Sequence, residues 1–448
     1  MGAEFPIHGG LPVAHPGPLP EAADVVVIGG GVIGVMTAWE LAKAGHRAVL
    51  VEKGRVAGEQ SSRNWGWVRA QGRDLAELPI MLEAQGMWPQ LEREAGDLGL
   101  RQTGTLYLAD TDAEVARFSE WLESAKDYQL STRLLDADEV AAHLPHAARR
   151  WKGALYTPTD YRAEPWITVP KFAAAAERDG AVIVEHCAAR ALRVEAGRVT
   201  GVVTEQGMVR AEAVVLAGGA WSSLFLRRHG VSIPQLSVRA TVMATQPLPE
   251  VYGGGAVDSR LAWRRRQDGG YSLAPEGFHE LFVGPDAFRA FRGFARQLIA
   301  DPLGTRYLPM APKNYPDAWS TRRRWAEDEE SPFEAMRVLN PRPNAAKVRK
   351  LARDFAATFP GVGEVRAQTA WAGMIDVLPD VVPIVDRCDA LPGLTICTGM
   401  CGHGFGIGPA MGRIAARLAT GRDTGHDLSR FRLKRFLDGS PLALGPNL

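Results

Sequence analysis

Three glycines near the N-terminus, Gly29, Gly31 and Gly34, have the G-x-G-x-x-G spacing that suits a phosphate group. The first glycine permits a tight turn, the second lets backbone N–H groups approach a pyrophosphate, and the third lets a helix pack closely on a strand. Glu52 follows at a distance where its carboxylate can accept hydrogen bonds from an adenosine ribose. The pattern predicts dinucleotide binding, and the alternative is a glycine-rich loop used only for close packing.

The segments around these glycines have the pattern of a strand, a helix and a second strand. The β-branched run from Val25 to Ile28 predicts a buried strand, residues 32–44 an apolar helix, and Ala48 to Val51 a second strand. The N-terminus of the helix adds partial positive charge at the turn. These elements strengthen the prediction of dinucleotide binding, but they do not distinguish FAD from NAD.

A second glycine-rich turn, residues 399–409, lies near the C-terminus between a predicted strand, Leu394 to Thr398, and a predicted helix that ends near Gly421. Pro409 suits the first turn of that helix. The backbone N–H groups and the helix N-terminus are expected to face one point, which favours a group that becomes negative. Reduced flavin becomes anionic, whereas nicotinamide loses its charge on reduction. This turn therefore favours a flavin.

The polar loop at residues 54–74 carries two tryptophans, Trp65 and Trp67, close to Arg63 and Arg69. Because the loop directly follows the predicted dinucleotide unit, we expect the indoles to stack on or beside a flavin. The alternative is that both indoles anchor a long loop to the core while the arginines are solvated.

Length and composition limit the class of protein. A chain of 448 residues exceeds the size at which one core keeps growing, so two domains are expected. A net charge of +1 argues against a nucleic-acid partner. Residues 1–23 are rich in proline and lack the features of a secretory signal, so we expect an extension that lies across the surface.

The four cysteines are too few and too scattered for a disulfide framework, and their spacing is poor for a metal site. They are Cys187, Cys388, Cys397 and Cys401. The sequence therefore predicts reduced, buried cysteines in a cytoplasmic protein. The glycines and Trp39-Glu40 that interrupt the apolar run near Val25 favour a buried strand and helix over an integral membrane segment.

The middle of the chain shows two patterns. A helix opened by Pro170 is followed by four short strand-like runs between residues 181 and 210, which predict a small antiparallel meander. The stretch from Gln235 to Thr369 mixes short strands, basic clusters and two helices, and it predicts a second domain inserted into the first.

Taken together, the N-terminal unit, the strand and glycines of Val214 to Ser222 and the turn from Gly402 to Phe405 resemble the FAD-dependent D-amino-acid oxidase superfamily. Residues 160–165 also resemble the linker of that superfamily into its middle helix. The resemblance covers nearly the whole chain. It implies an α/β fold in which a Rossmann-like FAD-binding domain of the glutathione-reductase type carries an inserted mixed-sheet α+β substrate domain.

The resemblance also implies how the chain divides and which residues contact FAD. The FAD-binding domain would comprise residues 24–75, 151–234 and 370–440, and the substrate domain residues 76–150 and 235–369. The residues implied or expected to bind FAD are Gly29, Gly31, Gly34, Glu52, Lys53, Ser61, Ser62, Arg63, Asn64, Trp65, Gly66, Trp67, Ala189, Ala217, Gly218, Gly219, Trp221, Gly402, His403, Gly404, Phe405 and Gly406.

Two departures from the superfamily pattern lie after Trp371. Glycine oxidase-like members have a carboxylate-binding arginine after the W-A-G-x segment, whereas this chain has Ile375 and Asp376. Sarcosine oxidase-like members attach FAD through a cysteine in this region, and residues 373–380 contain none, so we expect FAD to be bound non-covalently.

If the substrate has a carboxylate, another arginine must bind it, because a guanidinium fits that group best. The candidates are Arg69, Arg239, Arg265 and Arg324. Asp376 could pair with a substrate ammonium or have a purely structural partner, and Trp371 could form an aromatic wall of the pocket. For His403, orientation of the cofactor is favoured over proton transfer.

The resulting hypothesis is oxidation of the C–N bond of an amino acid, with an apolar or aromatic side chain, to an imine that water converts to an oxo acid and ammonia. The alternatives are an opine or secondary-amine dehydrogenase subunit and a non-catalytic electron-relay flavoprotein. The expected partners are the small amine substrate and oxygen or another electron acceptor. Substrate stereochemistry and self-association are left open.

Overall fold

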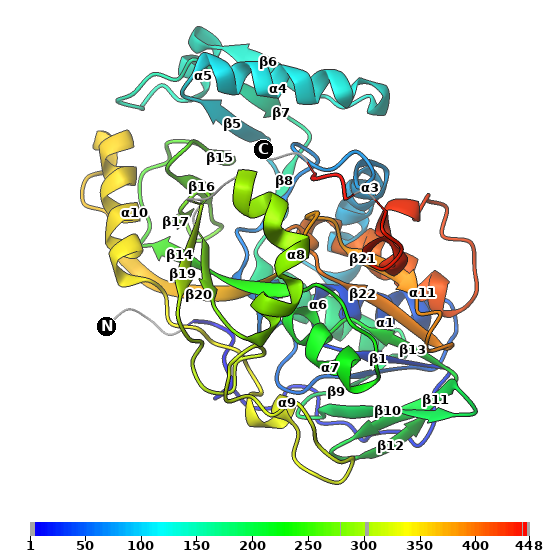
Figure 1. The fold of residues 1–448 in the computed structure, drawn as a ribbon. Helices are drawn as coiled ribbons and strands as arrows, with labels where there is room; N and C mark the ends of the chain where they lie inside the picture. Colours follow the sequence, from blue (N-terminus) through cyan, green and yellow to red (C-terminus); the bar gives the residue numbers. More distant parts are fainter. Residues whose placement is uncertain (1–4, 278, 301–303, 441, 446–448) are drawn as a thin grey trace.

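The computed structural model describes residues 5–277, 279–300, 304–440 and 442–445. Within them the chain forms a six-stranded sheet, a ten-stranded sheet and two three-stranded sheets, with helices packed around the two larger ones. Figure 1 shows the six-stranded sheet at the lower right and most strands of the ten-stranded sheet at the left and top. The predicted dinucleotide-binding glycines, Gly29, Gly31 and Gly34, follow a strand of the six-stranded sheet.

The six-stranded sheet collects strands from three distant parts of the chain. In spatial order they are β21 (Ile384–Arg387), β22 (Leu394–Thr398), β13 (Ala213–Leu216), β1 (Val25–Ile28), β2 (Ala48–Val51) and β9 (Val182–Val184). All neighbours pair in parallel except β21 and β22. The predicted strands at residues 25–28, 48–51 and 394–398 are therefore confirmed.

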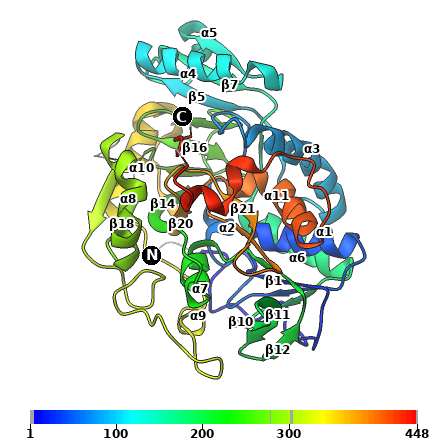
Figure 2. The same ribbon diagram turned by 45° about the vertical axis from the view of Figure 1, so that its right-hand side comes forward.

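The side chains of β1 alternate between two cores. Val25 and Val27 face a core shared with four helices, whereas Val26 and Ile28 face a core shared with a small antiparallel sheet. The helices are α1 (Val32–Lys43), α3 (Leu78–Ala95), α6 (Pro165–Arg178) and α11 (Gly404–Ala419), which lie side by side in Figure 2. The antiparallel sheet consists of β10 (Ala189–Glu195), β11 (Arg198–Thr204) and β12 (Gly207–Arg210). Both faces of the dinucleotide unit are thus covered.

The ten-stranded sheet forms the wall opposite the dinucleotide unit. In order it contains β19 (Thr305–Leu308), β18 (His279–Phe282), β14 (Leu236–Thr245), β17 (Tyr271–Ala274), β16 (Ala262–Arg265), β15 (Gly255–Val257), β5 (Thr105–Ala109), β7 (Gly153–Thr157) and β6 (Arg133–Asp136), and β20 (Ala367–Val377) pairs with β14. The helices packed around it are α4 (Asp112–Ser124), α5 (Ala137–His143), α8 (Pro285–Ala300) and α10 (Ala345–Thr358). The sequence assigns β7 and residues 370–377 of β20 to FAD-binding segments, but both strands hydrogen-bond to strands of this sheet.

Short elements connect the two large sheets. They are α2 (Gln60–Arg63), α7 (Ser222–Arg228), α9 (Pro332–Ala335) and a three-stranded sheet of β3 (Trp67–Val68), β8 (Tyr161–Arg162) and β4 (Arg101–Gln102). The loop predicted at residues 54–74 therefore contains both a helical turn, α2, and a strand, β3.

Three local predictions are wrong. The helix expected to open at Pro170 begins at Pro165, and the helix expected to have Pro409 in its first turn begins at Gly404. Apolar residues on both sides of each proline are buried, so tertiary packing outweighs the helix-breaking tendency of proline. The expected four-stranded meander has three strands, because β9 pairs with β2 in the six-stranded sheet.

The sequence predicts an N-terminal extension that lies across the surface. In its described part, residues 5–23, this prediction is wrong near the start. Phe5 and Ile7 are buried, and Phe5 packs against Trp166 and Trp371 with ring centroids 6.1 and 5.0 Å away. Residues 1–4 lie outside the described residues. No helix among the described residues is long and apolar enough to cross a membrane.

Candidate active site

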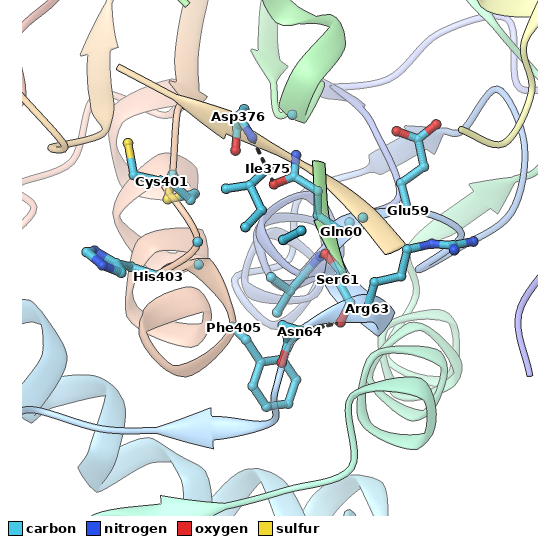
Figure 3. A pocket seen from close by; sticks show the side chains of 18 of the residues that line it. Glu59, Gln60, Ser61, Arg63, Asn64, Ile375, Asp376, Cys401, His403 and Phe405 are labelled. Atoms are coloured by element: carbon cyan, nitrogen blue, oxygen red, sulfur yellow. Dashed lines mark hydrogen bonds between the residues drawn. The ribbon is translucent and has the colours of Figure 1, made fainter. Parts of the chain in front are cut away.

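A cavity of about 720 Å³ lies where the ends of β1, β2, β13 and β22 face the ten-stranded sheet. Its lining includes the N-terminal glycine turn, α2, the start of α11 and residues of β5, β14 and β20. Figure 3 shows one part of it, with Cys401 and His403 on one wall and Gln60, Ser61 and Asn64 on the other. The cavity therefore joins the predicted cofactor region to the predicted substrate region.

The first glycine turn is tight enough to exclude side chains. Gly29 has φ +111°, and a Cβ on Gly34 would lie 1.9 Å from the carbonyl oxygen of Gly29. A Cβ on Gly31 would lie 3.1 Å from the Ser61 hydroxyl oxygen, and that oxygen accepts a hydrogen bond of 2.9 Å from the Val32 N–H. Gly31 and Val32 line the cavity at the start of α1, where Ser61 accepts from the Val32 N–H, whereas Gly34 serves the packing of α1 on β1.

Glu52 ends β2 with both carboxylate oxygens engaged. They accept hydrogen bonds of 2.7 Å from the Gly30 N–H and 2.7 Å from the Gly54 N–H. Burial raises the pKa of the Glu52 carboxyl to about 7, although these hydrogen bonds and the charge of Lys53 act in the opposite direction. Because Glu52 also lines the cavity, its carboxylate can accept further hydrogen bonds from a ribose.

Lys53 and Trp221 lie together at the same end of the cavity. The Lys53 ammonium stands 4.5 Å from the centre of the Trp221 ring and 2.6 Å from a Glu59 oxygen. The Trp221 indole also donates to Glu59, at 3.1 Å. All three residues line the cavity, so this group fixes the wall beside Glu52.

Helix α2 and the strand after it carry the predicted loop residues. Ser61, Arg63, Asn64, Trp65 and Trp67 line the cavity, whereas Ser62 and Gly66 are buried behind it. The Trp65 and Trp67 rings meet edge to face with centroids 5.2 Å apart. The two indoles line the cavity and pack on the core, so stacking beside a flavin stays a prediction. The alternative of solvated arginines is wrong for Arg63, which is buried.

Arg63 lines the cavity, and its guanidinium also holds distant segments of the chain together. Its guanidinium donates to the Gly58 carbonyl at 3.1 Å, to the Asn340 side chain at 2.8 Å and to the Ala372 carbonyl at 3.1 Å. Its Cζ also lies 4.7 Å from the centre of the Phe5 ring. These contacts tie α2 to β20 and to the N-terminal extension.

The second glycine turn brings the N-terminus of α11 to the cavity. Gly402 has φ +83°, and Gly402, His403, Gly404, Phe405 and Gly406 all line the cavity. A Cβ on Gly406 would lie 3.0 Å from the Cα of Val68, so the helix start and the β3 strand are in close contact. The backbone N–H groups at this helix start are suited to a group that becomes negative.

His403 is oriented by a buried ion pair that sequence analysis missed. Arg73 and Glu77 pair at 3.2 Å, the Arg73 guanidinium donates to the His403 carbonyl at 3.1 Å, and His403 Nδ1 lies 3.6 Å from Glu77. Burial lowers the pKa of His403, against the raising effect of Glu77. In Figure 3 the imidazole points away from the space between the two walls. Both residues precede α3, which begins at Leu78, so no helical periodicity in the sequence marked this pair.

Asp376 is buried and lines the cavity, but its carboxylate has protein partners. It accepts a hydrogen bond of 2.8 Å from the Gly399 N–H and one of 3.2 Å from the Gln235 side chain. The Asp376 N–H donates to the Gln60 side chain at 3.2 Å, a contact drawn in Figure 3. Burial raises the pKa of the Asp376 carboxyl. These contacts favour the structural interpretation of Asp376.

Trp371 lies outside the lining of the cavity. Its indole N–H donates to the Arg63 carbonyl at 3.0 Å, and its ring packs between Phe5 and Trp166. Trp371 therefore does not form an aromatic wall of the cavity. The cavity-lining aromatic residues that the sequence did not predict include Tyr107, Phe118, Phe225 and Phe333. Their strand and helix patterns are those of ordinary core residues, so the sequence carried no specific signal for them.

Among the four candidate arginines, Arg69 lines the cavity and the other three do not. Arg239 pairs with Glu280 at 2.7 Å, Arg265 lies over the Tyr271 ring and Arg324 is exposed. The cavity therefore receives only Arg69 from the candidates for carboxylate binding.

Most of the predicted FAD-binding residues meet at the cavity. Those that line it are Gly29, Gly31, Glu52, Lys53, Ser61, Arg63, Asn64, Trp65, Trp67, Ala189, Ala217, Gly218, Gly219, Trp221, Gly402, His403, Gly404, Phe405 and Gly406. The remaining three, Gly34, Ser62 and Gly66, support the lining from behind. These residues fit FAD. The N-termini of α1 and α11 suit negative phosphates and a negatively charged flavin, and the Glu52 carboxylate can accept hydrogen bonds from a ribose in the same cavity.

Residues 24–418 match the family model described as FAD dependent oxidoreductase. The chain belongs to this family. It is similar to a glycine oxidase of Geobacillus kaustophilus, with 25% identity over 92% of this chain and 97% of the relative, and to an N-methyl-L-tryptophan oxidase of Citrobacter koseri, with 24% identity over 92% and 99%.

The solved structure of L-amino acid deaminase from Proteus myxofaciens in complex with anthranilate is also similar, with a TM-score of 0.91 and 28% identity over 97% of this chain and 98% of that one. The family and its relatives show that the chain is an FAD-dependent oxidoreductase that acts on amino acids or amines. The predicted family, fold class and cofactor are confirmed.

Proposed function

We propose that the protein oxidises the C–N bond of an amino acid with an apolar or aromatic side chain, giving an imine that water hydrolyses to an oxo acid and ammonia. The observation that carries this proposal is the composition of the cavity beyond the second glycine turn. There the lining combines apolar and aromatic residues with Arg69, the one of the four candidate arginines that reaches the cavity.

The apolar part of the cavity comes from five different elements of the fold, β5, α4, β14, β15 and β17. Its members are Tyr107, Leu108, Phe118, Val242, Val257 and Ala274. An apolar lining of this kind stabilises a hydrocarbon side chain by removing it from water, at roughly 25 cal/mol per Å² of buried area. It supports a substrate with a bulky apolar group.

The residues of the chain would bind and orient FAD and the substrate, and they need not donate a proton. FAD, when bound, supplies the acceptor for the hydride that leaves the carbon bearing the amine. Gly29, Gly31 and Glu52 would hold the adenosine and pyrophosphate part, and the start of α11 would stabilise negative charge at the flavin. His403 is oriented through Glu77, away from the cavity, which supports positioning over proton transfer.

The non-covalent attachment of FAD and the cytoplasmic location belong to the same proposal. The four cysteines are free, which supports a reducing compartment. Burial raises the pKa of Cys397 to about 12 and that of Cys401 well above its ordinary value, so neither thiol is activated as a nucleophile toward the flavin.

The experiment is anaerobic mixing of the FAD-loaded protein with a panel of L- and D-amino acids, followed by the loss of the flavin absorption band. Apolar and aromatic amino acids are expected to bleach the band and acidic ones are not. Detection of ammonia and of the oxo acid then identifies the products. If no amino acid or amine bleaches the band while a reduced donor protein does, the proposal fails and an electron-relay role is favoured.

A second candidate function is oxidation of an N-alkylated amino acid. The similarity to an N-methyl-L-tryptophan oxidase favours it, since that relative is named for an aromatic substrate with a secondary amine. Inclusion of N-methylated amino acids in the panel separates the two functions, because an N-methyl substrate oxidised at its methyl group yields formaldehyde and not ammonia.

A further inference from the structure

Residues 331–339, which we call the clasp, lie against the end of β2. The Lys53 ammonium donates hydrogen bonds of 2.8 Å to the Met336 carbonyl and 2.9 Å to the Arg337 carbonyl. A terminal nitrogen of Arg337 donates in return to the Lys53 carbonyl at 2.9 Å. A Cβ on Gly54 would lie 2.0 Å from the Arg337 carbonyl oxygen, so the two backbones are in direct contact. The clasp therefore packs on the backbone beside the expected ribose site.

Two ion pairs hold the clasp to the small antiparallel sheet of β10, β11 and β12. Arg190, on β10, makes a forked contact with Glu334, and the shortest distance between a nitrogen and an oxygen is 2.6 Å. Arg337 donates through both terminal nitrogens to Glu205, which follows β11, at 2.6 and 2.5 Å. The four side chains are between 7% and 29% exposed. Water and salt therefore screen these pairs less than pairs at the surface.

The clasp also forms part of the cavity wall. Phe333 lines the cavity and is 4% exposed. Its ring centroid lies 5.8 Å from that of Trp221 and 5.9 Å from that of Phe225, and both of these residues line the cavity as well. The Leu339 N–H donates at 2.9 Å to Glu59, the carboxylate that the Trp221 indole also contacts. Figure 1 shows α9, which carries Phe333, next to α7, which carries Phe225.

The contacts of the clasp can break without disrupting a sheet. Within the part of the chain that the structure describes, the clasp contains the helical turn α9 and pairs with no strand. It is held by ion pairs, by hydrogen bonds to carbonyl groups and by the packing of Phe333 and Leu339, which are both buried. A segment held in this way opens at a lower cost in free energy than the sheets on which it rests.

We infer that the clasp closes the adenosine end of the FAD site and that FAD is exchanged when the clasp opens. The first glycine turn and Glu52 suit the pyrophosphate and the ribose, and they line the same cavity as Phe333. Phe333 would then form part of the adenosine wall, and the two ion pairs would keep it in place. The inference concerns the cofactor and not the substrate, so it goes beyond the proposed function and does not depend on it.

The test uses the full-length protein and measures exchange of FAD and occupation of each end of the site. Release of FAD from the holoprotein is followed by the rise of flavin fluorescence after dilution, and entry by its quenching when FAD is added to the FAD-free protein. Binding of ADP to the FAD-free protein reports on the adenosine end alone. Binding of riboflavin reports on the flavin end alone.

The variants break one ion pair from its two sides. Arg337→Met changes the clasp, and Glu205→Gln changes its partner while the sequence of the clasp stays intact. Arg322→Met is the matched control, because the Arg322 guanidinium contacts Glu329 and the Glu330 carbonyl on its own stretch of chain and forms an exposed ion pair.

Both variants are expected to release FAD roughly tenfold faster than the wild type, since charge-assisted hydrogen bonds are lost. FAD should enter them at least as fast as it enters the wild type, because a looser clasp opens more often. The affinity for ADP should fall by a similar factor and the affinity for riboflavin should stay unchanged. Raising NaCl from 0.1 to 1 M should speed release from the wild type more than from the variants. Arg322→Met should match the wild type throughout.

Wild-type rates of FAD release and wild-type affinity for ADP in both variants would overturn the inference. Equal losses of affinity for ADP and riboflavin would also overturn it, because they would indicate a general loss of structure and not an opening at one end. If Arg337→Met does not fold, the comparison of Glu205→Gln with the wild type decides. None of these measurements requires turnover, so a failure of the proposed function leaves the test of the clasp intact.

Discussion

The carboxylate of Asp376, on β20, accepts a hydrogen bond of 2.8 Å from the backbone N–H of Gly399, at the end of β22. This contact joins the long antiparallel strand of the ten-stranded sheet to the turn that leads into α11. The second glycine turn is thus held by a strand of the other sheet.

Replacement of Asp376 by alanine should therefore destabilise the protein. The buried Gly399 N–H would lose its acceptor, at a cost of about 1–3 kcal/mol in the free energy of unfolding. Asp376→Asn keeps an acceptor and should retain most of the stability. Chemical denaturation and the fraction of bound FAD measure both effects. A stable Asp376→Asn with normal FAD content and a much weaker substrate affinity would instead support pairing of Asp376 with the substrate ammonium.

Binding of FAD should strengthen as the pH rises toward about 7, the pKa to which burial raises Glu52 from its ordinary 4.5. A ribose hydroxyl donates to the carboxylate form, so below pH 7 the affinity should fall by up to about tenfold per pH unit. Titration of the FAD-free protein by flavin fluorescence between pH 5.5 and 8 measures this. In Glu52→Gln the affinity should be lower and its dependence on pH should be lost.

The same carboxyl affects the stability of the FAD-free protein. Because the folded state keeps the Glu52 proton up to about pH 7 and the unfolded chain releases it near 4.5, the folded state binds more protons between these values. The contribution of Glu52 to the free energy of unfolding therefore falls as the pH rises through this window. A wild-type curve that matches that of Glu52→Gln would contradict this assignment.

The N-terminal extension should contribute to stability and to FAD retention. Phe5 is 6% exposed and packs against Trp371 and Arg63, so Phe5→Ala should cost about 3–5 kcal/mol. Because Arg63 holds α2 at the cavity, we expect a faster loss of FAD as well. The matched control is Val13→Ala, since Val13 is 38% exposed. Thermal unfolding with and without excess FAD separates the two effects.

The buried pair of Arg73 and Glu77 gives a further prediction. Glu77→Gln leaves the Arg73 guanidinium buried without a counter-charge, at an expected cost of about 3–5 kcal/mol. The double variant Arg73→Met, Glu77→Leu should recover part of this loss, because no charge is then buried. Glu139→Gln, which breaks an exposed pair with Arg133, should change little. Equal losses in the single and double variants would show that the contact to the His403 carbonyl dominates.

The sequence predicts the dinucleotide unit well because its signals are local. The strands at residues 25–28 and 48–51 are short β-branched runs, and the glycines between them are required by close contacts such as that of Gly34 with the Gly29 carbonyl. The strand at residues 394–398 and the helix after it follow the same local pattern. The family resemblance then supplied the cofactor.

What the sequence could not show depends on contacts between distant residues. Phe5 stands in a proline-rich run without periodicity, and its partners Trp166 and Trp371 lie far along the chain. Because these distant contacts are invisible in the sequence, the sequence predicts Trp371 beside the cavity, whereas the Trp371 ring is enclosed by Phe5 and Trp166. The choice of Arg69 among four arginines also required the fold, because only the arrangement of Glu280 and Tyr271 explains the places of Arg239 and Arg265.

The strand order of the six-stranded sheet has a consequence for synthesis of the chain on the ribosome. Strand β1 emerges early but pairs with β13, and β13 pairs with β22, which ends at residue 398. The nucleotide half of the protein therefore cannot finish folding as an early, separate unit while the rest is being translated. Chains interrupted before residue 394 are expected to expose an open sheet edge and to depend on chaperones until translation is complete.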